Sequence, residues 1–581
     1  MSTIIDLLRQ QFLAALSKAY PAQTWQLSQV EITPSTQTQF GHYQCNSAMK
    51  LAKLVGKAPR MIATDILAHL EKSDMIAKTE IAGPGFVNIT LEAAFLAARV
   101  GVMLNDARLG IATLGAHRKI VIDFSSPNTA KEMHVGHLRS TIIGDSLARI
   151  FEFLGYVVLR LNHIGDWGTA FGMLIAHMHD KAESVLSGKQ SATLTDLVAW
   201  YRESKKRFDE DEDFKKCAQL EVVALQSGKP AERHAWQIIC EISRRAYQEI
   251  YDLLDVKIID RGESFYNPML PEIVRELEQK GMVEISDGAK CVFPPGFVSR
   301  DNTRQPLIIQ KSDGGYNYAT TDLAALKHRV QVEKADHIAI LTDAGQASHF
   351  AMMFKVAELA GFYNPDKVRI DHVPFGVVLG PDGKKFRTRS GETERLIDLL
   401  TTGIEQAEQI LLERYGDSSS LDLKAMAHVL GVNAIKYADL TINRINDYTF
   451  SYERMLKFEG NTAAFIMYSY VRTASIKRKA GVNVESLIGK TSIQLNHPSE
   501  IDLAITLNQF AETLEQVSCD LMPNHLADYL YRLANAFNAF FRDCRVEGSE
   551  LQNSRLLLCE ATAQTLKTGM GLLGLKALEV M

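Results

Sequence analysis

His134 and His137, with Gly136 between them, have the residue types and the spacing of a site for a negatively charged ligand. Residues three apart lie on one face of a helical turn, so both imidazoles would point toward the same ligand. Gly136 would leave room for a flat base to approach the backbone. If a helix begins here, its free N–H groups and positive dipole end favour phosphate. The group therefore indicates a nucleotide site, although two histidines at this spacing also occur as ordinary polar surface, and neither a Walker-type nor a dinucleotide-type glycine motif occurs in this stretch.

Two groups of cations would complete such a site. Lys131 lies in the loop before the histidines, and a basic loop flanked by Gly383 and Gly391 lies far along the chain. The basic residues of this second loop are Lys384, Lys385, Arg387 and Arg389. Reactions at phosphate are catalysed mainly by positioning and electrostatic stabilisation, so mobile cations beside helix-end donors fit that chemistry. A basic loop flanked by glycines is more often plain surface, and the position of this loop after the second half of the sheet is what supports a lid over the nucleotide.

Acidic and aromatic residues of the chain are of the types that a cationic ligand would need. Asp123 ends an apolar run, and a helix through residues 318–322 would place Tyr318 and Asp322 on one face. A guanidinium is planar and carries five donors, so its pocket needs carboxylates that accept in pairs and an aromatic wall. Without that ligand, Asp322 could equally be a helix cap and Asp123 a strand-end turn residue.

Strands and one helix must position these groups. Residues 120–122 are apolar and predict a buried strand that ends at Asp123, and further strands are predicted at 156–161, 306–310 and 338–341. A helix after His137 is predicted from apolar residues at helical spacing, which are Ile143, Leu147, Ile150, Phe151 and Leu154. Ligands of an open parallel sheet bind where strands end and helices begin. The fold class is therefore α/β, with a Rossmann-like parallel sheet.

Length and patterning predict three domains. A chain of 581 residues is too long for one core. Residues 1–110 look like a small α+β domain, and residues 111–395 hold the sheet with a charged helical insertion at about 180–300. From 396 to 581 the strand signals stop and amphipathic helices follow one another, which predicts an all-α bundle.

Composition excludes several classes of protein. With 46% hydrophobic and 23% charged residues the chain is globular, and no apolar run is long enough to span a bilayer. The seven cysteines contain no C-x-x-C pair, which favours free thiols in a reducing cytosol over a zinc ribbon. A net charge of −5 gives no general attraction to nucleic acid, so any such binding depends on local basic clusters.

Five segments together carry a family resemblance. Residues 123–141, DFSSPNTAKEMHVGHLRST, closely resemble the HIGH signature of class I aminoacyl-tRNA synthetases in the arginyl form S-x-N-x-A-K-x-x-H-x-G-H-x-R-S. The match continues, in family order, at NHIGDWG (162–168), YATTDL (318–323), KKFRTRSG (384–391) and EGNT (459–462). The chain is thereby identified as a member of the bacterial-type arginyl-tRNA synthetases, and the basic loop resembles the family's degenerate KMSKS signature.

This resemblance implies a reaction and its partners. The enzyme would activate L-arginine with ATP to arginyl-adenylate, release pyrophosphate, and transfer arginine to the 3′ end of tRNA(Arg). ATP would be a substrate that brings Mg²⁺, with no tightly bound cofactor and no metal held by the protein alone. The resemblance also implies a cytoplasmic monomer with no membrane partner.

It also implies roles for individual residues. His134, Gly136 and His137 would bind ATP, and the catalytic groups would be these two histidines together with Lys131, Lys384, Lys385, Arg387 and Arg389. Arginine would contact Asp123, Tyr318 and Asp322 through its side chain, and Asn128 and Gln346 through its polar backbone end. The tRNA D-loop would contact Phe86 and Asn88 in the N-terminal domain. The anticodon would contact Phe465, Tyr468, Arg472 and Met581.

Three alternatives remain open from the residues. Another H-x-G-H enzyme, such as a small-molecule adenylyltransferase, would not need the large helical C-terminal domain. A non-catalytic RNA-binding relative would have no reason to keep His134, His137, Lys131, Asp123 and Asp322 together. A metal held by His134, His137 and His163 lacks a carboxylate or cysteine at zinc spacing.

Overall fold

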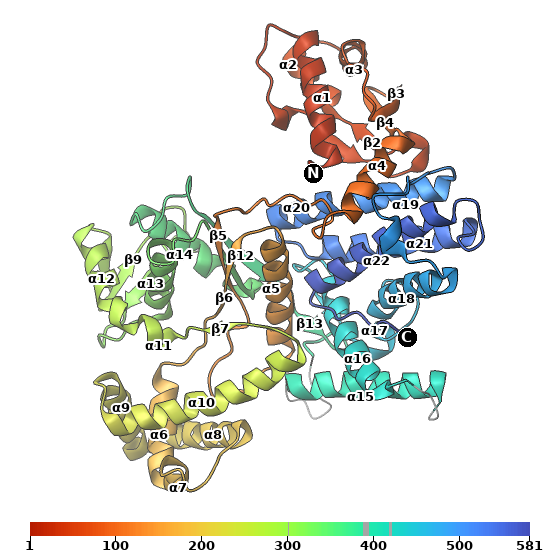
Figure 1. Cartoon of the computed structure of the whole chain (residues 1–581). Helices are drawn as coiled ribbons and strands as arrows, with labels where there is room; N and C mark the ends of the chain where they lie inside the picture. Colours follow the sequence, from red (N-terminus) through yellow and green to blue (C-terminus); the bar gives the residue numbers. More distant parts are fainter. Residues whose placement is uncertain (300, 387–393, 417–420) are drawn as a thin grey trace. The chain divides into compact units, whose positions relative to one another are not determined.

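The structure, a computed structural model, describes residues 1–299, 301–386, 394–416 and 421–581 (Figure 1). Two compact units emerge from its contacts. The first unit comprises Met1–Thr113, Lys457–Gly571 and Lys576–Met581, and the second comprises Leu114–Leu456 and Leu572–Leu575. Both chain ends therefore fold into one unit, and the middle of the chain forms the other. Among the described residues, no helix has the length and apolarity needed to cross a membrane.

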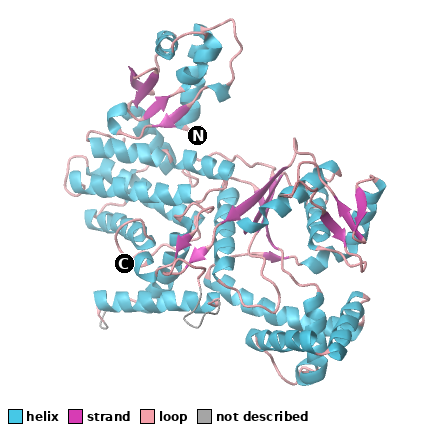
Figure 2. Cartoon of the chain, turned by 180° about the vertical axis from the view of Figure 1, so that it is seen from behind, coloured by secondary structure: helices cyan, strands magenta, loops and turns pink. Residues whose placement is uncertain are grey.

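A five-stranded parallel sheet forms the centre of the second unit, in the order β12-β11-β5-β6-β7 (Figure 2). The strands are β5 (Lys119–Asp123), β6 (Val157–Asn162), β7 (Ile259–Asp260), β11 (His337–Asp343) and β12 (Arg369–Phe375). Ile120, Val121 and Ile122 are fully buried, as the apolar run predicts. The predicted α/β class with a parallel sheet is confirmed, and Asp123 ends the central strand.

Helices cover this sheet and hold its edge residues. They are α5 (Val135–Phe153), α13 (Tyr318–Gln331) and α14 (Ala347–Leu359), whereas α6 (Thr169–Lys181) packs against the helices of the insertion described below. The helix predicted after His137 is confirmed as α5, which is buried along most of its length. Close packing requires glycine at Gly144, because a Cβ there would lie 2.2 Å from the ring of Phe124. The first residue of the loop between β5 and α5, Phe124, is thus packed directly against α5.

Between β6 and β11 the chain forms a helical insertion and a small sheet. The helices are α7 (Glu183–Leu186), α8 (Leu194–Glu210), α9 (Glu212–Gln226), α10 (Pro230–Leu253), α11 (Glu263–Tyr266) and α12 (Leu270–Gln279). The antiparallel strands are β8 (Val283–Ser286), β9 (Ala289–Val292) and β10 (Leu307–Gln310). The stretch predicted as a helical insertion thus also contains β7, β8 and β9. β7 escaped prediction because it has only two residues, both exposed, and leaves no apolar run.

The second unit ends in helices that pack onto α5. These elements are β13 (Val378–Leu379), α15 (Leu396–Tyr415), α16 (Leu423–Leu440), β14 (Tyr448–Thr449) and α17 (Tyr452–Met455). Arg139 of α5 is buried and forms an ion pair with Asp439 of α16 at 3.2 Å. Its guanidinium also donates to the carbonyls of Gly376 and Asn446, at 2.8 and 2.9 Å. One arginine of the signature stretch therefore fastens α5 to three later segments.

The first unit combines an antiparallel sheet with a helical bundle. Its N-terminal elements are α1 (Ile4–Ala19), β1 (Ile32–Pro34), β2 (Tyr43–Cys45), α2 (Ser47–Val55), α3 (Pro59–Ala68), β3 (Ile76–Ala82), β4 (Phe86–Leu91) and α4 (Ala93–Leu104). Its C-terminal helices are α18 (Ala463–Ala480), α19 (Pro498–Asn508), α20 (Phe510–Asp520), α21 (Asn524–Asp543) and α22 (Gln552–Leu572). Buried polar contacts join the two sets: Arg99 donates to Asn508 at 2.8 Å, and the Tyr43 hydroxyl lies 3.0 Å from Glu512.

Candidate active site

The tip of α5 carries both histidines of the signature. His134 is the N-cap residue, and its Nδ1 accepts a hydrogen bond from the Gly136 amide at 3.1 Å. The His137 Nδ1 accepts from the His134 amide, also at 3.1 Å, and the two ring centroids lie 4.1 Å apart. Because both Nδ1 atoms accept, each ring carries its proton on Nε2. The two Nε2–H groups are therefore available as donors to a ligand.

Both rings are uncharged at neutral pH. Burial and the nearby Lys385 charge lower the pKa of His134. Burial, together with His134 and Lys131, lowers the pKa of His137 to about 3. We call Lys131, His134 and His137 the histidine end of the site. Its positive charge comes from lysines, whereas its imidazoles act as neutral donors.

The loop leading to this tip has a strained backbone. Ser125, Ser126 and Ala130 have φ values of +69°, +50° and +59°, a region that non-glycine residues rarely adopt. Their amides are held by the Ser140 hydroxyl, the Asn162 side chain and the Ser243 hydroxyl, respectively, at 2.9 to 3.0 Å. Strain of this kind persists only where surrounding contacts enforce it, and it is typical of binding sites.

Helix α10 of the insertion clamps the same loop. The Tyr247 hydroxyl lies 2.7 Å from the Asn128 carbonyl and 2.8 Å from the Lys131 carbonyl. The Tyr251 hydroxyl lies 2.8 Å from the Ser125 hydroxyl. Since Ser243 bonds the Ala130 amide, three residues of one helix fix the loop. The sequence analysis assigned no role to these residues, because their contacts span more than 100 positions.

A group of carboxylates lies at the other end of the site. Asp322 of α13 contacts His349 Nε2 of α14 at 2.7 Å. Asp166 accepts from the Ser264 amide and hydroxyl at 2.8 and 2.6 Å. Burial and the charges of Asp166 and Asp322 raise the pKa of Glu263 to about 8. We call Asp166, Glu263 and Asp322 the acidic end of the site. A bound cation would relieve the mutual repulsion of these carboxylates.

Tyr318 lies next to this acidic end. It is the first residue of α13 and is 70% exposed. Burial of its hydroxyl and the charge of Glu263 raise its pKa, which places the phenol near that carboxylate. Tyr318 and Asp322 share α13 at a four-residue step, as predicted. An exposed ring beside clustered carboxylates is suitable as the wall of a pocket for a planar cation.

Asp123 already has a partner within the chain. Its Oδ2 lies 2.6 Å from Nη2 of Arg329, and both side chains are buried. Its Oδ1 accepts from the Ser126 hydroxyl at 3.1 Å. Asp123 therefore supports the strained loop, and Arg329 neutralises its charge. The sequence analysis did not identify Arg329, which lies 206 positions away.

The other predicted residues of the second unit lie around this loop. Asn128 is exposed, and its side chain covers Gly165, where a Cβ would be 2.2 Å from the amide oxygen. Gln346 is exposed in the short helix η4 (Ala344–Gln346) at the end of β11. Lys384 and Lys385 are exposed after β13. Arg387 and Arg389 lie outside the described residues.

The predicted tRNA-contacting residues all lie in the first unit. Phe86 begins β4 and is half-buried, whereas Asn88 is 8% exposed and accepts from Gln44 Nε2 at 2.8 Å. Both residues lie in one strand, which pairs with β2 and β3 and is largely buried, and Asn88 already has a hydrogen-bond partner. Their contact with a D-loop base stays a prediction.

Helix α18 presents a basic and aromatic face. The Arg472 guanidinium lies 4.9 Å from the Tyr468 ring centroid, and it donates to Asn538 of α21 at 2.7 Å. Phe465 lies one turn earlier, with its ring centroid 5.5 Å from that of Tyr531. Met581 is half-buried at the chain end. Phe465, Tyr468 and Arg472 thus gather on one helix, in a form suited to stacking on an unpaired base.

Glu263 is the main site residue that the sequence analysis missed. It follows β7 in the segment Asp260-Arg261-Gly262-Glu263, which the sequence analysis placed inside the insertion. Gly262 packs against Asp166, where a Cβ would lie 2.4 Å from the carboxylate. The available signal was the position of a polar residue directly after a strand of the parallel sheet. Recognising that strand was the missing step.

The alternative of a metal held by His134, His137 and His163 is not supported. Among the described residues these three do not form a group with ligand atoms in mutual reach. The Nδ1 atoms of the first two rings are also occupied by backbone amides.

Comparisons with known proteins cover the whole chain. It matches the family descriptions "Arginyl tRNA synthetase N terminal domain" over 6–91, "tRNA synthetases class I (R), catalytic domain" over 99–452, and "DALR anticodon binding domain" over 466–581. It is 59% identical over 588 residues to the arginine--tRNA ligase of Protochlamydia amoebophila, with 100% of each chain covered. It is 52% identical to that of Chlamydia felis, covering 94% of this chain and 95% of the relative.

Solved structures agree with these matches. The arginyl-tRNA synthetase of Plasmodium falciparum has a TM-score of 0.87 and 32% identity, with 100% of both chains covered. The Thermus thermophilus arginyl-tRNA synthetase has a TM-score of 0.78 at 22% identity, again over 100% of both chains, and supports the fold alone.

Proposed function

The chain belongs to the arginyl-tRNA synthetase family, and from that premise we propose which of its residues carry out each part of the reaction. The family resemblance drawn from the motifs is confirmed. The enzyme is an arginine–tRNA ligase: it activates arginine with ATP and transfers it to tRNA(Arg). The match over the full chain does not favour a small-molecule adenylyltransferase or a non-catalytic RNA-binding relative.

The histidine end binds the triphosphate in this proposal. The arginine carboxylate attacks the α-phosphorus, and the bond to pyrophosphate breaks, so negative charge grows on the phosphate oxygens. The Nε2–H groups of His134 and His137 donate to those oxygens, and Lys131 adds positive charge. The observation that carries this assignment is the pair of hydrogen bonds accepted by Nδ1, which leaves Nε2 as the donor atom of each ring. Donors fixed before binding cost no reorganisation during the reaction.

The basic loop adds further positive charge. Lys384 and Lys385 approach the transferred phosphates in this proposal, together with Arg387 and Arg389. Support comes from Lys385, whose charge lowers the pKa of His134 and which therefore lies near the tip of α5. Closure of such a loop would exclude water from the adenylate.

The acidic end binds the guanidinium of arginine. Asp322 and Glu263 accept its N–H groups, and the ring of Tyr318 flanks it. Asn128 and Gln346 contact the amino and carboxylate end of the substrate. The family resemblance implies that Asp123 contacts the arginine side chain, whereas this proposal makes Asp123 a positioning residue that holds the loop through Arg329 and Ser126. The raised pKa of Glu263 supports a pocket that is completed by a cation.

The proposal extends to tRNA, to Mg²⁺ and to the state of the enzyme. Phe86 and Asn88 contact the D-loop, and Phe465, Tyr468, Arg472 and Met581 contact the anticodon. Mg²⁺ enters with ATP, since this ion prefers phosphate oxygens and water, and it neutralises charge on the leaving pyrophosphate. We place the enzyme in the cytoplasm as a monomer, on the family's role in translation.

ATP–pyrophosphate exchange with each of the twenty amino acids, with and without total tRNA, tests this function. Exchange should occur with arginine alone among the amino acids. The presence or absence of exchange without tRNA then tells whether activation requires tRNA. Exchange with another amino acid, or none under either condition, would contradict the proposal.

A further inference from the structure

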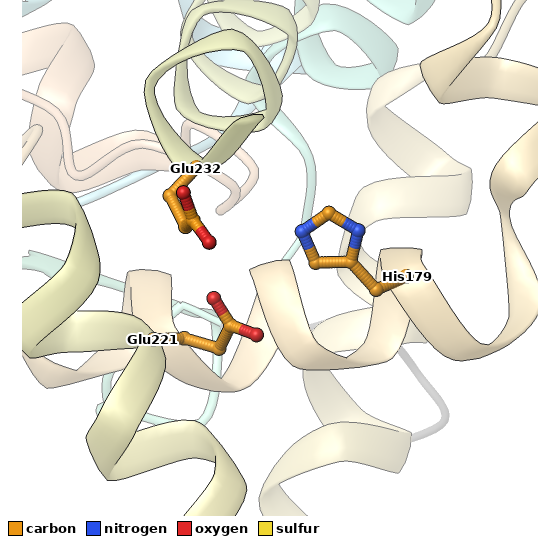
Figure 3. A group of neighbouring side chains, drawn as sticks. All are labelled: His179, Glu221 and Glu232. Atoms are coloured by element: carbon orange, nitrogen blue, oxygen red, sulfur yellow. The ribbon is translucent and has the colours of Figure 1, made fainter. Parts of the chain in front are cut away.

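Three helices of the insertion bring an imidazole and two carboxylates together (Figure 3). His179 comes from α6, Glu221 from α9 and Glu232 from the first turn of α10. One potential ligand atom from each residue lies within 4.8 Å of the other two. Figure 3 shows the carboxylates facing each other with the imidazole ring beside them. None of the three belongs to the active site described above.

The charges of this cluster are not balanced by hydrogen bonds. Glu221 Oε2 and Glu232 Oε2 are both buried, and no group among the described residues donates to them. Burial and the neighbouring Glu232 raise the pKa of Glu221, although His179 and Lys229 oppose that rise. Buried carboxylate oxygens normally have partners, and two that face each other repel. A proton or a cation between them would relieve this repulsion.

We propose that His179, Glu221 and Glu232 bind a divalent transition-metal ion, with Zn²⁺ as the best match. A neutral imidazole and two carboxylates carry a charge of −2, which a divalent ion balances. Three protein ligands and one water complete the tetrahedral coordination that Zn²⁺ prefers. The imidazole ligand disfavours Mg²⁺ and Ca²⁺, which bind oxygen ligands.

Such an ion would fasten the insertion to the signature loop. It would join α6 and α9 to α10, and α10 carries Ser243 and Tyr247, which hold that loop. Two of these helices already share a small core, formed by Met173 and Ala176 of α6 with Phe214 and Ala218 of α9. The ion would add a fixed cross-link to this small core, so its main effect is expected in the insertion.

Zinc counting on the full-length protein tests this site. Metal-stripped enzyme is equilibrated with Zn²⁺, passed through a desalting column, and analysed for bound zinc by atomic emission. The chain has 16 histidines and seven cysteines, which are potential sites of additional zinc uptake, so the readout is the difference between variants. Wild type should hold one equivalent more than Glu221→Gln, Glu232→Gln or His179→Gln. A tenfold excess of Mg²⁺ should not remove that equivalent.

Glu249→Gln is the matched control, because Glu249 is an exposed glutamate on the same helix, α10. It should bind as much zinc as wild type. Hydrogen exchange gives a second readout: Zn²⁺ should slow amide exchange in α6 and α9 of wild type but not of Glu221→Gln. Equal zinc content in wild type and the three cluster variants, or exchange that Zn²⁺ leaves unchanged in wild type, would overturn the proposal.

Discussion

The histidine end and the acidic end of the active site are prepared for their ligands in opposite ways. At the histidine end, hydrogen bonds to Nδ1 and lowered pKa values keep His134 and His137 neutral, with Nε2 as the donor atom of each ring. At the acidic end, like charges crowd together, and the pKa of Glu263 rises to about 8. The first end is complete before binding, whereas the second needs a cation to become fully ionised.

This difference separates two tasks that the enzyme performs on neighbouring ligands. Fixed neutral donors suit a transition state, because they need no rearrangement when charge develops on phosphate. A carboxylate cluster suits recognition, because a ligand with positive charge stabilises its fully ionised form. We therefore expect changes at the histidine end to reduce the rate, and changes at the acidic end to reduce arginine affinity.

His137→Ala is expected to have the largest effect. It removes one preorganised donor, which should slow arginine-dependent pyrophosphate exchange by roughly two to three orders of magnitude in kcat. The KM for arginine should stay within about twofold, since the acidic end is intact. His137→Gln keeps an N–H donor and should recover part of the rate. A larger change in the KM for arginine than in kcat would contradict the assignment of rate to the histidine end and of arginine affinity to the acidic end.

Asp322→Asn should act on arginine instead. Loss of one charge-assisted hydrogen bond costs about 1.5–3 kcal/mol, so kcat/KM for arginine should fall roughly ten- to a hundredfold. The KM for ATP should not change. His349→Gln serves as the comparison, because it removes the internal partner of Asp322 and leaves the carboxylate in place. Unchanged arginine kinetics in Asp322→Asn would reject its assignment to the guanidinium.

Arg472→Ala should affect neither end. Arg472 packs on the Tyr468 ring in the first unit, so its loss should raise the KM for tRNA by about tenfold through lost stacking and charge. Pyrophosphate exchange at saturating tRNA should remain at the wild-type rate. The measurement is aminoacylation against tRNA concentration. An equal loss of exchange activity would show that this helix is needed for the chemistry.

The pH dependence of arginine binding should give the smallest effect. Without ligand, the Glu263 carboxyl is protonated below about pH 8 and ionised above it. The guanidinium keeps its charge throughout, so affinity for arginine should rise with pH, by roughly fivefold from pH 7 to pH 8. Calorimetry in two buffers should also detect release of a proton. Glu263→Gln should flatten the profile, and a flat wild-type profile would mean that Glu263 is already ionised.

The sequence predicted the parts of the site that are local in the chain. The apolar run before Asp123 and the periodic residues after His137 predicted β5 and α5, and the spacing of the histidines predicted their adjacency. Contacts between segments that are far apart in the chain leave no periodic or spacing pattern in the sequence from which they could be predicted. Arg329 and Tyr247 act through partners more than 100 positions away. Glu263 was missed because the strand before it, β7, is only two residues long and both of them are exposed.

The joining of both chain ends in one unit has a consequence for synthesis on the ribosome. The hydrogen-bond partner of the Tyr43 hydroxyl, Glu512, is synthesised 469 residues later. The partner of Arg99, Asn508, is synthesised 409 residues later. At about 5–20 residues per second, these gaps last tens of seconds. During that time the residues of the N-terminal segment that will contact the C-terminal helices stay exposed, while the middle of the chain emerges from the ribosome. A chaperone that acts during translation would therefore find its main target in the first hundred residues.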